Sequence, residues 1–178
     1  VPFSMEFTEP QQKFSVSPVM RPRRILVVED STLQAKRLKR LLVENGYDTE
    51  VAVNGQQGLE LAVQLRPSLI LSDIIMPVMD GYQMCRTIKS DPRIQHIPVV
   101  LLTSLSDPRD VFRGLESGAD SYISKPYDKA TLLGRIGSVL NALRSPDREG
   151  PQEELVVFVG GKRYAITSTR RQILNLLL

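Results

Sequence analysis

Three acids, a hydroxyl and an ammonium follow short apolar runs of the 178-residue sequence, in the order Glu29, Asp30, Asp73, Thr103 and Lys125. Like charges that gather closely cannot all stay ionised without a cation, so clustered carboxylates here predict raised pKa values or a bound divalent metal. Oxygen ligands without a Cys/His cluster favour Mg²⁺. A carboxylate beside such an ion, with an ammonium and a hydroxyl to bind phosphoryl oxygens, is suited to attack phosphorus, which makes Asp73 the candidate nucleophile.

Each of these residues also has a plainer interpretation. Asp30 with Ser31 could cap a helix, Asp73 could start a turn, and Lys125 could lie on the surface. Single motif matches carry a high false-positive risk, but five of them at the ends of apolar runs are poorly explained by coincidence. We therefore expect the five side chains to converge.

Convergence requires that the apolar runs form neighbouring strands of one sheet. Apolar or alternating runs predict strands, and segments with helical spacing and stop signals predict helices between them. The predicted strands span 24–30, 47–53, 68–73, 97–104 and 119–125, and the predicted helices span 31–46, 55–65, 81–90, 107–118 and 128–143. Strict alternation predicts an open, five-stranded parallel α/β sheet with helices on both faces. In the strand order 2-1-3-4-5, the ligand site lies at the carboxyl ends of the first and third strands.

Composition and charge restrict the location and the partners. The net charge of +3 is small, and aromatic residues are sparse and not interleaved with the basic ones, so we expect no direct nucleic-acid binding by this portion. No apolar run approaches the roughly 18 residues of a membrane span. A lone cysteine, Cys85, and the absence of a leader of signal-peptide type favour the cytoplasm.

The motifs "ILVVED", "DIIMPVMDG", "PVVLLTS" and "GADSYISKP" together resemble the receiver domains of two-component signalling, which share the fold of the chemotaxis protein CheY. The resemblance covers residues 24 to about 143. It implies that Asp73 is the phosphoacceptor and that Thr103 and Lys125 bind the phosphoryl group. It also implies that Tyr122 is the switch aromatic, whose rotamer follows Thr103.

The resemblance further implies a magnesium site and a cis Lys125–Pro126 bond. Asp30, Asp73 and the backbone carbonyl of Ile75 would hold Mg²⁺, and Glu29 would assist mainly through water. Glu29 stands where the family more often has aspartate, a change that lengthens the side chain and keeps its charge.

The sequence is predicted to divide into a flexible lead-in over 1–22, a receiver domain over 23–144, a linker over 145–154 and an extension over 155–178. In the extension, "ELVVFV", "GG" and "KRYAI" predict a hairpin, and "TSTRRQILNLLL" predicts the start of a helix that leads into a truncated output module. The resemblance implies a phosphohistidine donor, either a histidine kinase or a phosphotransfer domain, and leaves open whether the domain forms a homodimer.

Several functions of the whole protein stay open. A hybrid histidine kinase is the preferred context, because the extension resembles segments that join receivers to kinase modules; a DNA-binding or cyclic-dinucleotide response regulator is the alternative. An aspartate-nucleophile phosphatase is more remote, since that chemistry needs a second acid two residues after the nucleophile, where Ile75 stands. A flavodoxin-like cofactor binder is disfavoured because the acidic edge would repel a flavin phosphate. Enzymatic activity of this portion would be limited to its own phosphorylation and dephosphorylation.

Overall fold

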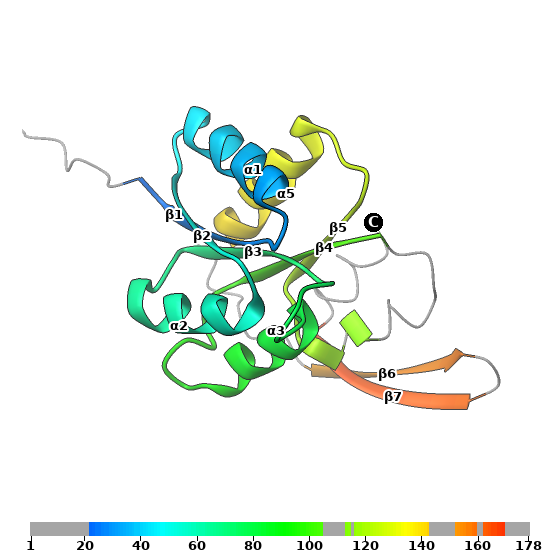
Figure 1. Cartoon of the computed structure of the whole chain (residues 1–178). Coiled ribbons are helices and arrows are strands. Elements are labelled where there is room, and N and C mark those ends of the chain that lie inside the picture. Colours follow the sequence, from blue (N-terminus) through cyan, green and yellow to red (C-terminus); the bar gives the residue numbers. More distant parts are fainter. Residues whose placement is uncertain (1–21, 105–112, 115, 143–151, 160–161, 170–178) are drawn as a thin grey trace, which may run out of the picture.

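A parallel sheet of five strands forms the centre of the molecule (Figure 1). The computed structural model describes residues 22–104, 113–114, 116–142, 152–159 and 162–169. The strands of the sheet are β1 Arg24–Val28, β2 Asp48–Ala52, β3 Leu69–Asp73, β4 Val99–Thr103 and β5 Ser121–Ser124. They lie in the order β2-β1-β3-β4-β5 with parallel pairing throughout, which confirms the predicted fold class.

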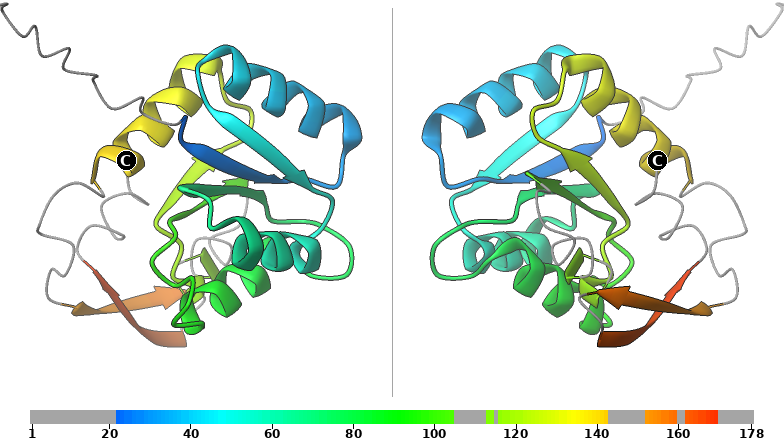
Figure 2. Two further views of the ribbon diagram at one scale, coloured as in Figure 1. Left: turned by 90° about the vertical axis from the view of Figure 1, so that its left-hand side faces the viewer. Right: turned by 90° about the vertical axis from the view of Figure 1, so that its right-hand side faces the viewer.

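Four helices cover the sheet within the described residues. They are α1 Thr32–Glu44, α2 Gly55–Leu65, α3 Gly81–Ser90 and α5 Lys129–Ala142. Figure 2 shows α1 and α5 on one face of the sheet and α2 and α3 on the other. Because both faces are covered, the inner strands β1, β3 and β4 are mostly apolar, and β4 is buried along its whole length. The outer strands β2 and β5 carry more polar residues. Most of the helix predicted over 107–118 lies outside the described residues, although positions 113–114 and 116–117 have helical backbone.

The core therefore consists of two apolar layers, one on each face of the sheet. On the α1 and α5 side the layer is aliphatic, with Leu38, Leu42, Ile136 and Leu140 packed on the strands. On the α2 and α3 side it also contains sulfur and aromatic side chains, among them Met84, Cys85, Tyr82 and Tyr122.

Side-chain caps fix where three helices begin. Ser31, Asn54 and Asp80 are the N-cap residues of α1, α2 and α3, and each side chain accepts a hydrogen bond from the backbone N–H three residues later. Both α2 and α3 begin and end at the predicted residues. Each of these caps follows or closely follows the carboxyl end of a strand, so the same residues also set the loops around the site.

The extension contains two antiparallel strands, β6 Gln152–Val159 and β7 Lys162–Thr169, which pair over eight residues each and form the predicted hairpin. Both strands are longer than predicted. β6 includes residues 152–154 of the predicted linker, and β7 includes Thr167–Thr169, which the sequence analysis placed at the start of a helix. Threonine favours extended backbone, which is consistent with this longer pairing. Residues 170–178 of the predicted helix lie outside the described part of the chain.

No helix in the described part of the chain is long and apolar enough to cross a membrane.

Candidate functional site

The three predicted acids meet at the carboxyl edge of the sheet, where β1 and β3 end side by side. Val28 of β1 pairs with Ser72 of β3, so the residues that follow each of them are neighbours. Carboxylate oxygens of Glu29, Asp30 and Asp73 all lie within 4.8 Å of one another. Glu29 and Asp73 are 44 positions apart in the sequence. The topology brings them together because β1 and β3 are neighbours in the sheet.

The three acids differ in how far their side chains are exposed to solvent. Glu29 is 1% exposed, Asp73 is partly buried and Asp30 faces solvent. The backbone N–H of Ser31 donates to Glu29 Oε1 at 3.2 Å, whereas Glu29 Oε2 is buried and has no hydrogen-bond partner. A buried carboxylate oxygen without a donor is costly unless a cation reaches it.

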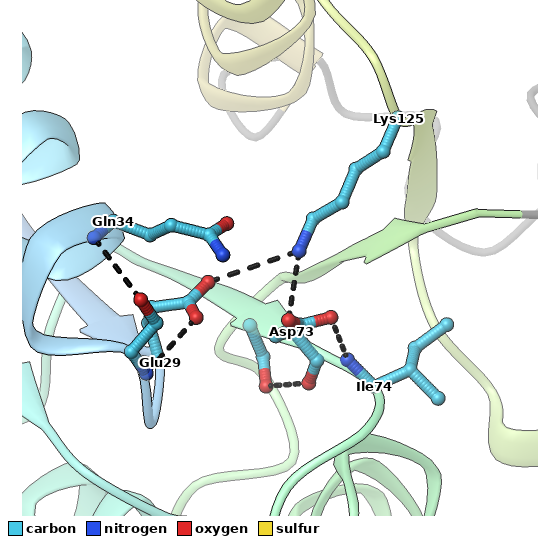
Figure 3. Close-up of polar contacts among 7 residues, drawn as sticks. Glu29, Gln34, Asp73, Ile74 and Lys125 are labelled. Atoms are coloured by element: carbon cyan, nitrogen blue, oxygen red, sulfur yellow. Dashed lines mark hydrogen bonds and ion pairs between the residues drawn. The ribbon is translucent and has the colours of Figure 1, made fainter.

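Lys125 supplies a positive charge that faces Asp73 and Glu29 (Figure 3). Its Nζ donates to Asp73 Oδ2 at 2.7 Å and lies 3.8 Å from Glu29 Oε2. The backbone N–H of Ile74 donates to the other oxygen, Asp73 Oδ1, at 2.7 Å. Asp73 is therefore oriented from both sides, with one oxygen on an ammonium and one on a peptide N–H.

The electrostatics of the cluster are unbalanced. Burial raises the pKa of Glu29, and the nearby charge of Asp73 raises it further; Lys125 and the Ser31 N–H act in the opposite direction. One ammonium thus faces the carboxylates of Asp73 and Glu29, and a third carboxylate, Asp30, lies near both of these acids. A hard divalent cation among these oxygens would remove the repulsion, and the donor set of carboxylates fits Mg²⁺.

The loop after Asp73 is held by backbone contacts rather than by side chains. Gly81 N–H donates to the Ile74 carbonyl at 2.9 Å, and Gly55 N–H donates to the Met79 carbonyl at 3.1 Å, which ties the loop to α2. A Cβ at Gly81 would overlap the Asp73 carbonyl oxygen, so this close approach requires glycine. Ile75, whose backbone carbonyl was predicted to bind a metal ion, is 78% exposed.

Thr103 lies on β4, which is next to β3, and Tyr122 lies on β5, which is next to β4. Thr103 ends β4 and is buried, and its carbonyl accepts a hydrogen bond from the Lys125 N–H at 2.6 Å. Tyr122 is 6% exposed and packs in the layer between the sheet and α2 and α3. The Lys125–Pro126 bond is cis, as the resemblance implies.

Two contributors to the site are absent from the sequence analysis. The Ile74 N–H is a backbone group, and no residue type reveals its direction. Tyr127 packs half-buried on the α1 and α5 side; burial raises the pKa of its phenol, and the charges of Glu29 and Asp73 raise it further. Its place directly after the Lys125–Pro126 pair was the available signal.

Comparison with known proteins agrees with this geometry. The sequence matches the response regulator receiver domain over residues 25–137. It is 39% identical over 117 residues to the DNA-binding dual master transcriptional regulator RpaA of Synechocystis, which covers 66% of this chain and 48% of that protein. It is 49% identical over 116 residues to histidine kinase P4 of Formosa agariphila, which covers 65% of this chain and 8% of that protein. The chain thus spans half or less of the length of these two relatives.

Solved structures give the same result. The receiver domain of a signal transduction histidine kinase from Syntrophus aciditrophicus is 46% identical, with a TM-score of 0.67, over 71% of this chain and 96% of that one. The receiver domain of sensor histidine kinase PA1611 from Pseudomonas aeruginosa, solved with a magnesium ion in its active-site cleft, is 28% identical, with a TM-score of 0.64, over 67% of this chain and 98% of that one. From its sheet order, its carboxylate cluster and these matches, this chain belongs to the response regulator receiver domain family.

Proposed function

We propose that this chain accepts a phosphoryl group on Asp73 from a phosphohistidine and passes the resulting conformational change to an output module. The observation that carries the proposal is the unbalanced cluster at the carboxyl edge, where three carboxylates lie within 4.8 Å of one another and the ammonium of Lys125 pairs with two of them. Such an arrangement is poor for stability and well suited to bind a cation and then a phosphoryl group.

In the proposed reaction an Asp73 carboxylate oxygen attacks phosphorus. A P–O bond forms as the P–N bond to the donor imidazole breaks, and the electron pair of that bond leaves with the imidazole. The Lys125 ammonium, which lies 2.7 Å from Asp73 Oδ2, turns toward the phosphoryl oxygens and binds them, while the Ile74 N–H keeps Oδ1 oriented. Positioning and charge neutralisation supply most of the catalysis in phosphoryl transfer.

Glu29, Asp30 and Asp73 would hold Mg²⁺, with the Ile75 carbonyl as a further ligand. The orphaned Oε2 of Glu29 supports this assignment, because it is a buried acceptor without a donor. When bound, the ion would neutralise charge on the phosphoryl oxygens.

After transfer, the new phosphoryl oxygens would draw Thr103 and Lys125 toward them. Thr103 and Lys125 are already joined by a backbone hydrogen bond between β4 and the end of β5, so movement of one carries to the other. Tyr122, three residues before Lys125 on β5, would then change its population between buried and exposed positions.

The proposed donor is a histidine kinase or a phosphotransfer domain, and the proposed context is a hybrid histidine kinase. The similarity to receivers of histidine kinases supports this context. A DNA-binding response regulator is the second candidate, favoured by the similarity to RpaA. Kinase domains encoded beyond Leu178 in the gene would support the first candidate, and a DNA-binding domain there would contradict it.

The first test is the intact mass of the chain after incubation with acetyl phosphate, with and without Mg²⁺. We expect a Mg²⁺-dependent gain of one phosphoryl group, no gain for Asp73→Asn, and an undiminished gain for the control Asp48→Asn, which changes an acid at the opposite edge of the sheet. A gain that persists in Asp73→Asn would overturn the assignment of the acceptor.

The second test addresses the relay. Lys125→Ala should weaken the conformational response to phosphorylation, measured by comparing amide NMR spectra before and after phosphorylation. A variant with normal phosphorylation and a normal spectral response would disprove the proposed part of Lys125 in the switch.

A further inference from the structure

Tyr122 occupies its buried position because the residue facing its ring has no side chain. Gly114 lies in the helical segment that precedes β5, and a Cβ built there would stand 2.7 Å from Tyr122 Cε1, 3.0 Å from Cζ and 3.0 Å from the hydroxyl oxygen. Real Cβ atoms essentially never approach aromatic carbons that closely. Tyr122 and an alanine at position 114 therefore cannot both keep their present positions.

The backbone of Gly114 is fixed, so it cannot easily retreat. The hydroxyl of Ser117 is buried and donates to the Gly114 carbonyl at 2.6 Å. The helical turn then ends at Gly118, whose φ of 73° is the left-handed conformation that often closes a helix. The tyrosine side chain is thus the more mobile of the two partners.

The buried position carries an electrostatic cost as well. The hydroxyl oxygen of Tyr122 is buried and has no hydrogen-bond partner, and burial raises the pKa of the phenol. The Ser117 hydroxyl acts in the opposite direction on this pKa, but it donates its hydrogen to the Gly114 carbonyl. In an outward position, water would satisfy the Tyr122 hydroxyl, so the buried state depends on close packing of the ring.

We propose that Gly114 sets the balance between the buried and exposed positions of Tyr122, and that the unpaired hydroxyl keeps this balance close enough to be shifted. The glycine supplies the space that makes burial sterically allowed, and the hydroxyl supplies the cost that opposes it. The consequence for signalling rests on the proposed function, in which Tyr122 is the switch residue; the steric relation itself does not.

The test uses unphosphorylated protein labelled with fluorotyrosine and observed by fluorine NMR. The chain has five tyrosines, and Tyr122→Phe assigns the resonance of Tyr122 by its disappearance. A soluble paramagnetic chelate then reports exposure of that ring. Gly134→Ala is the matched control, because Gly134 is also helical and a Cβ there meets nothing within 4 Å.

We expect Gly114→Ala to shift the ratio of buried to exposed Tyr122 about tenfold toward the exposed position, and Gly134→Ala to leave it unchanged. Unchanged shielding of Tyr122 in a folded Gly114→Ala protein would overturn the proposal.

A double variant keeps the test decisive if Gly114→Ala does not fold. In a Tyr122→Ala background, Gly114→Ala should be tolerated as well as Gly134→Ala is, because the clashing ring is gone. Equal damage from Gly114→Ala with and without the ring would show that the alanine collides with something else, which would also overturn the proposal.

A last experiment tests whether the ratio of buried to exposed Tyr122 is linked to phosphorylation. With Mg²⁺ and beryllium fluoride as a phosphoryl mimic, wild-type Tyr122 should move further toward the buried position, and Gly114→Ala should bind the mimic several-fold more weakly. Binding of the mimic with no change at Tyr122 would contradict the switch in the proposed function while leaving the steric result from unphosphorylated protein intact.

Discussion

A lysine of similar exposure lies at each end of the parallel strands, in very different surroundings. We call the two ends the amino edge, where the strands begin, and the carboxyl edge, where they finish. At the amino edge, Lys89 is 20% exposed, and its Nζ donates to Asp120 Oδ2 at 2.6 Å, to the Ile97 carbonyl at 2.9 Å and to the Gln95 carbonyl at 3.3 Å. At the carboxyl edge, Lys125 is 22% exposed and faces the carboxylates of Asp73 and Glu29. The first ammonium uses all three of its donors, and the second is outnumbered by acids.

This difference separates a structural ion pair from a functional one. Asp120 Oδ2 also accepts from the Val99 N–H at 2.8 Å, so the charges at the amino edge are matched and hydrogen-bonded. At the carboxyl edge, Glu29 keeps a buried oxygen without a hydrogen-bond partner. A balanced pair contributes to stability, whereas an unbalanced cluster costs stability and has affinity for the missing charge.

The largest effect on stability should come from the balanced edge. Lys89→Met removes the ion pair with Asp120 and the hydrogen bonds to two carbonyls, and we expect a loss of about 2 kcal/mol in the free energy of unfolding, reduced from the fully buried case by the partial exposure of Asp120. Urea denaturation measures it, with Lys36→Met on the exposed face of α1 as the control. Phosphorylation by acetyl phosphate should persist. A loss no greater than that of the control would show that the network is not structural.

The opposite sign is expected at the carboxyl edge. Without divalent metal, Glu29→Gln removes a buried negative charge next to Asp73 and should stabilise the protein by about 1–2 kcal/mol at neutral pH. The same variant should bind Mg²⁺ more weakly. If Glu29→Gln destabilised the metal-free protein at neutral pH, the idea that this carboxylate is held at a cost would be wrong.

The effect of Glu29→Gln should depend on pH in a defined direction. The folded protein holds the Glu29 carboxyl with a pKa above its ordinary value of 4.5, so its contribution is favourable below the unfolded pKa and is lost as the pH rises through the folded pKa. The advantage of Glu29→Gln over wild type should therefore be absent below about pH 4, grow through this window and stay constant above it. Urea midpoints measured across this range in EDTA test the direction.

Metal addition should act through the same imbalance. Mg²⁺ at ten times its dissociation constant should raise the stability of the wild type by about 1.4 kcal/mol, because it binds the folded site and not the unfolded chain. Asp30→Ala should remove most of this gain, and Asp48→Ala, at the other edge, should retain it. Equal stabilisation of both variants would mean that the ion acts elsewhere.

The carboxyl edge was the more predictable of the two. Its residues stand directly after apolar runs, so the alternation of strands and helices was enough to bring Glu29, Asp30 and Asp73 to one place. The bounds of α2 and α3 followed from segments with helical spacing, and the structure shows Asn54 and Asp80 as the N-caps of these helices. A site built from side chains at the ends of strands can therefore be predicted from residue types and their positions in the sequence.

The contacts at the amino edge and the packing of Gly114 against Tyr122 could not be predicted in the same way. Lys89 meets Asp120 across 31 positions, and its other two acceptors are backbone carbonyls, which every residue possesses. The fit of Gly114 against Tyr122 depends on the angle of a helical segment to β5, which periodicity does not give. The end of β7 was missed because Thr167–Thr169 satisfies both a capping pattern and a strand pattern.

The smallest effect should come from an ion pair at the amino edge that lacks burial. Arg24 Nε lies 2.6 Å from Asp48 Oδ2, the same separation as in the Lys89 pair, but these side chains are 41% and 40% exposed. Water screens such a pair, so Arg24→Gln should cost no more than about 0.5 kcal/mol in urea denaturation. Because the two pairs share an edge and a distance, the contrast isolates burial and the extra carbonyl acceptors as the source of the Lys89 contribution. A cost for Arg24→Gln equal to that of Lys89→Met would mean that distance, rather than burial and complete hydrogen bonding, decides what an ion pair contributes here.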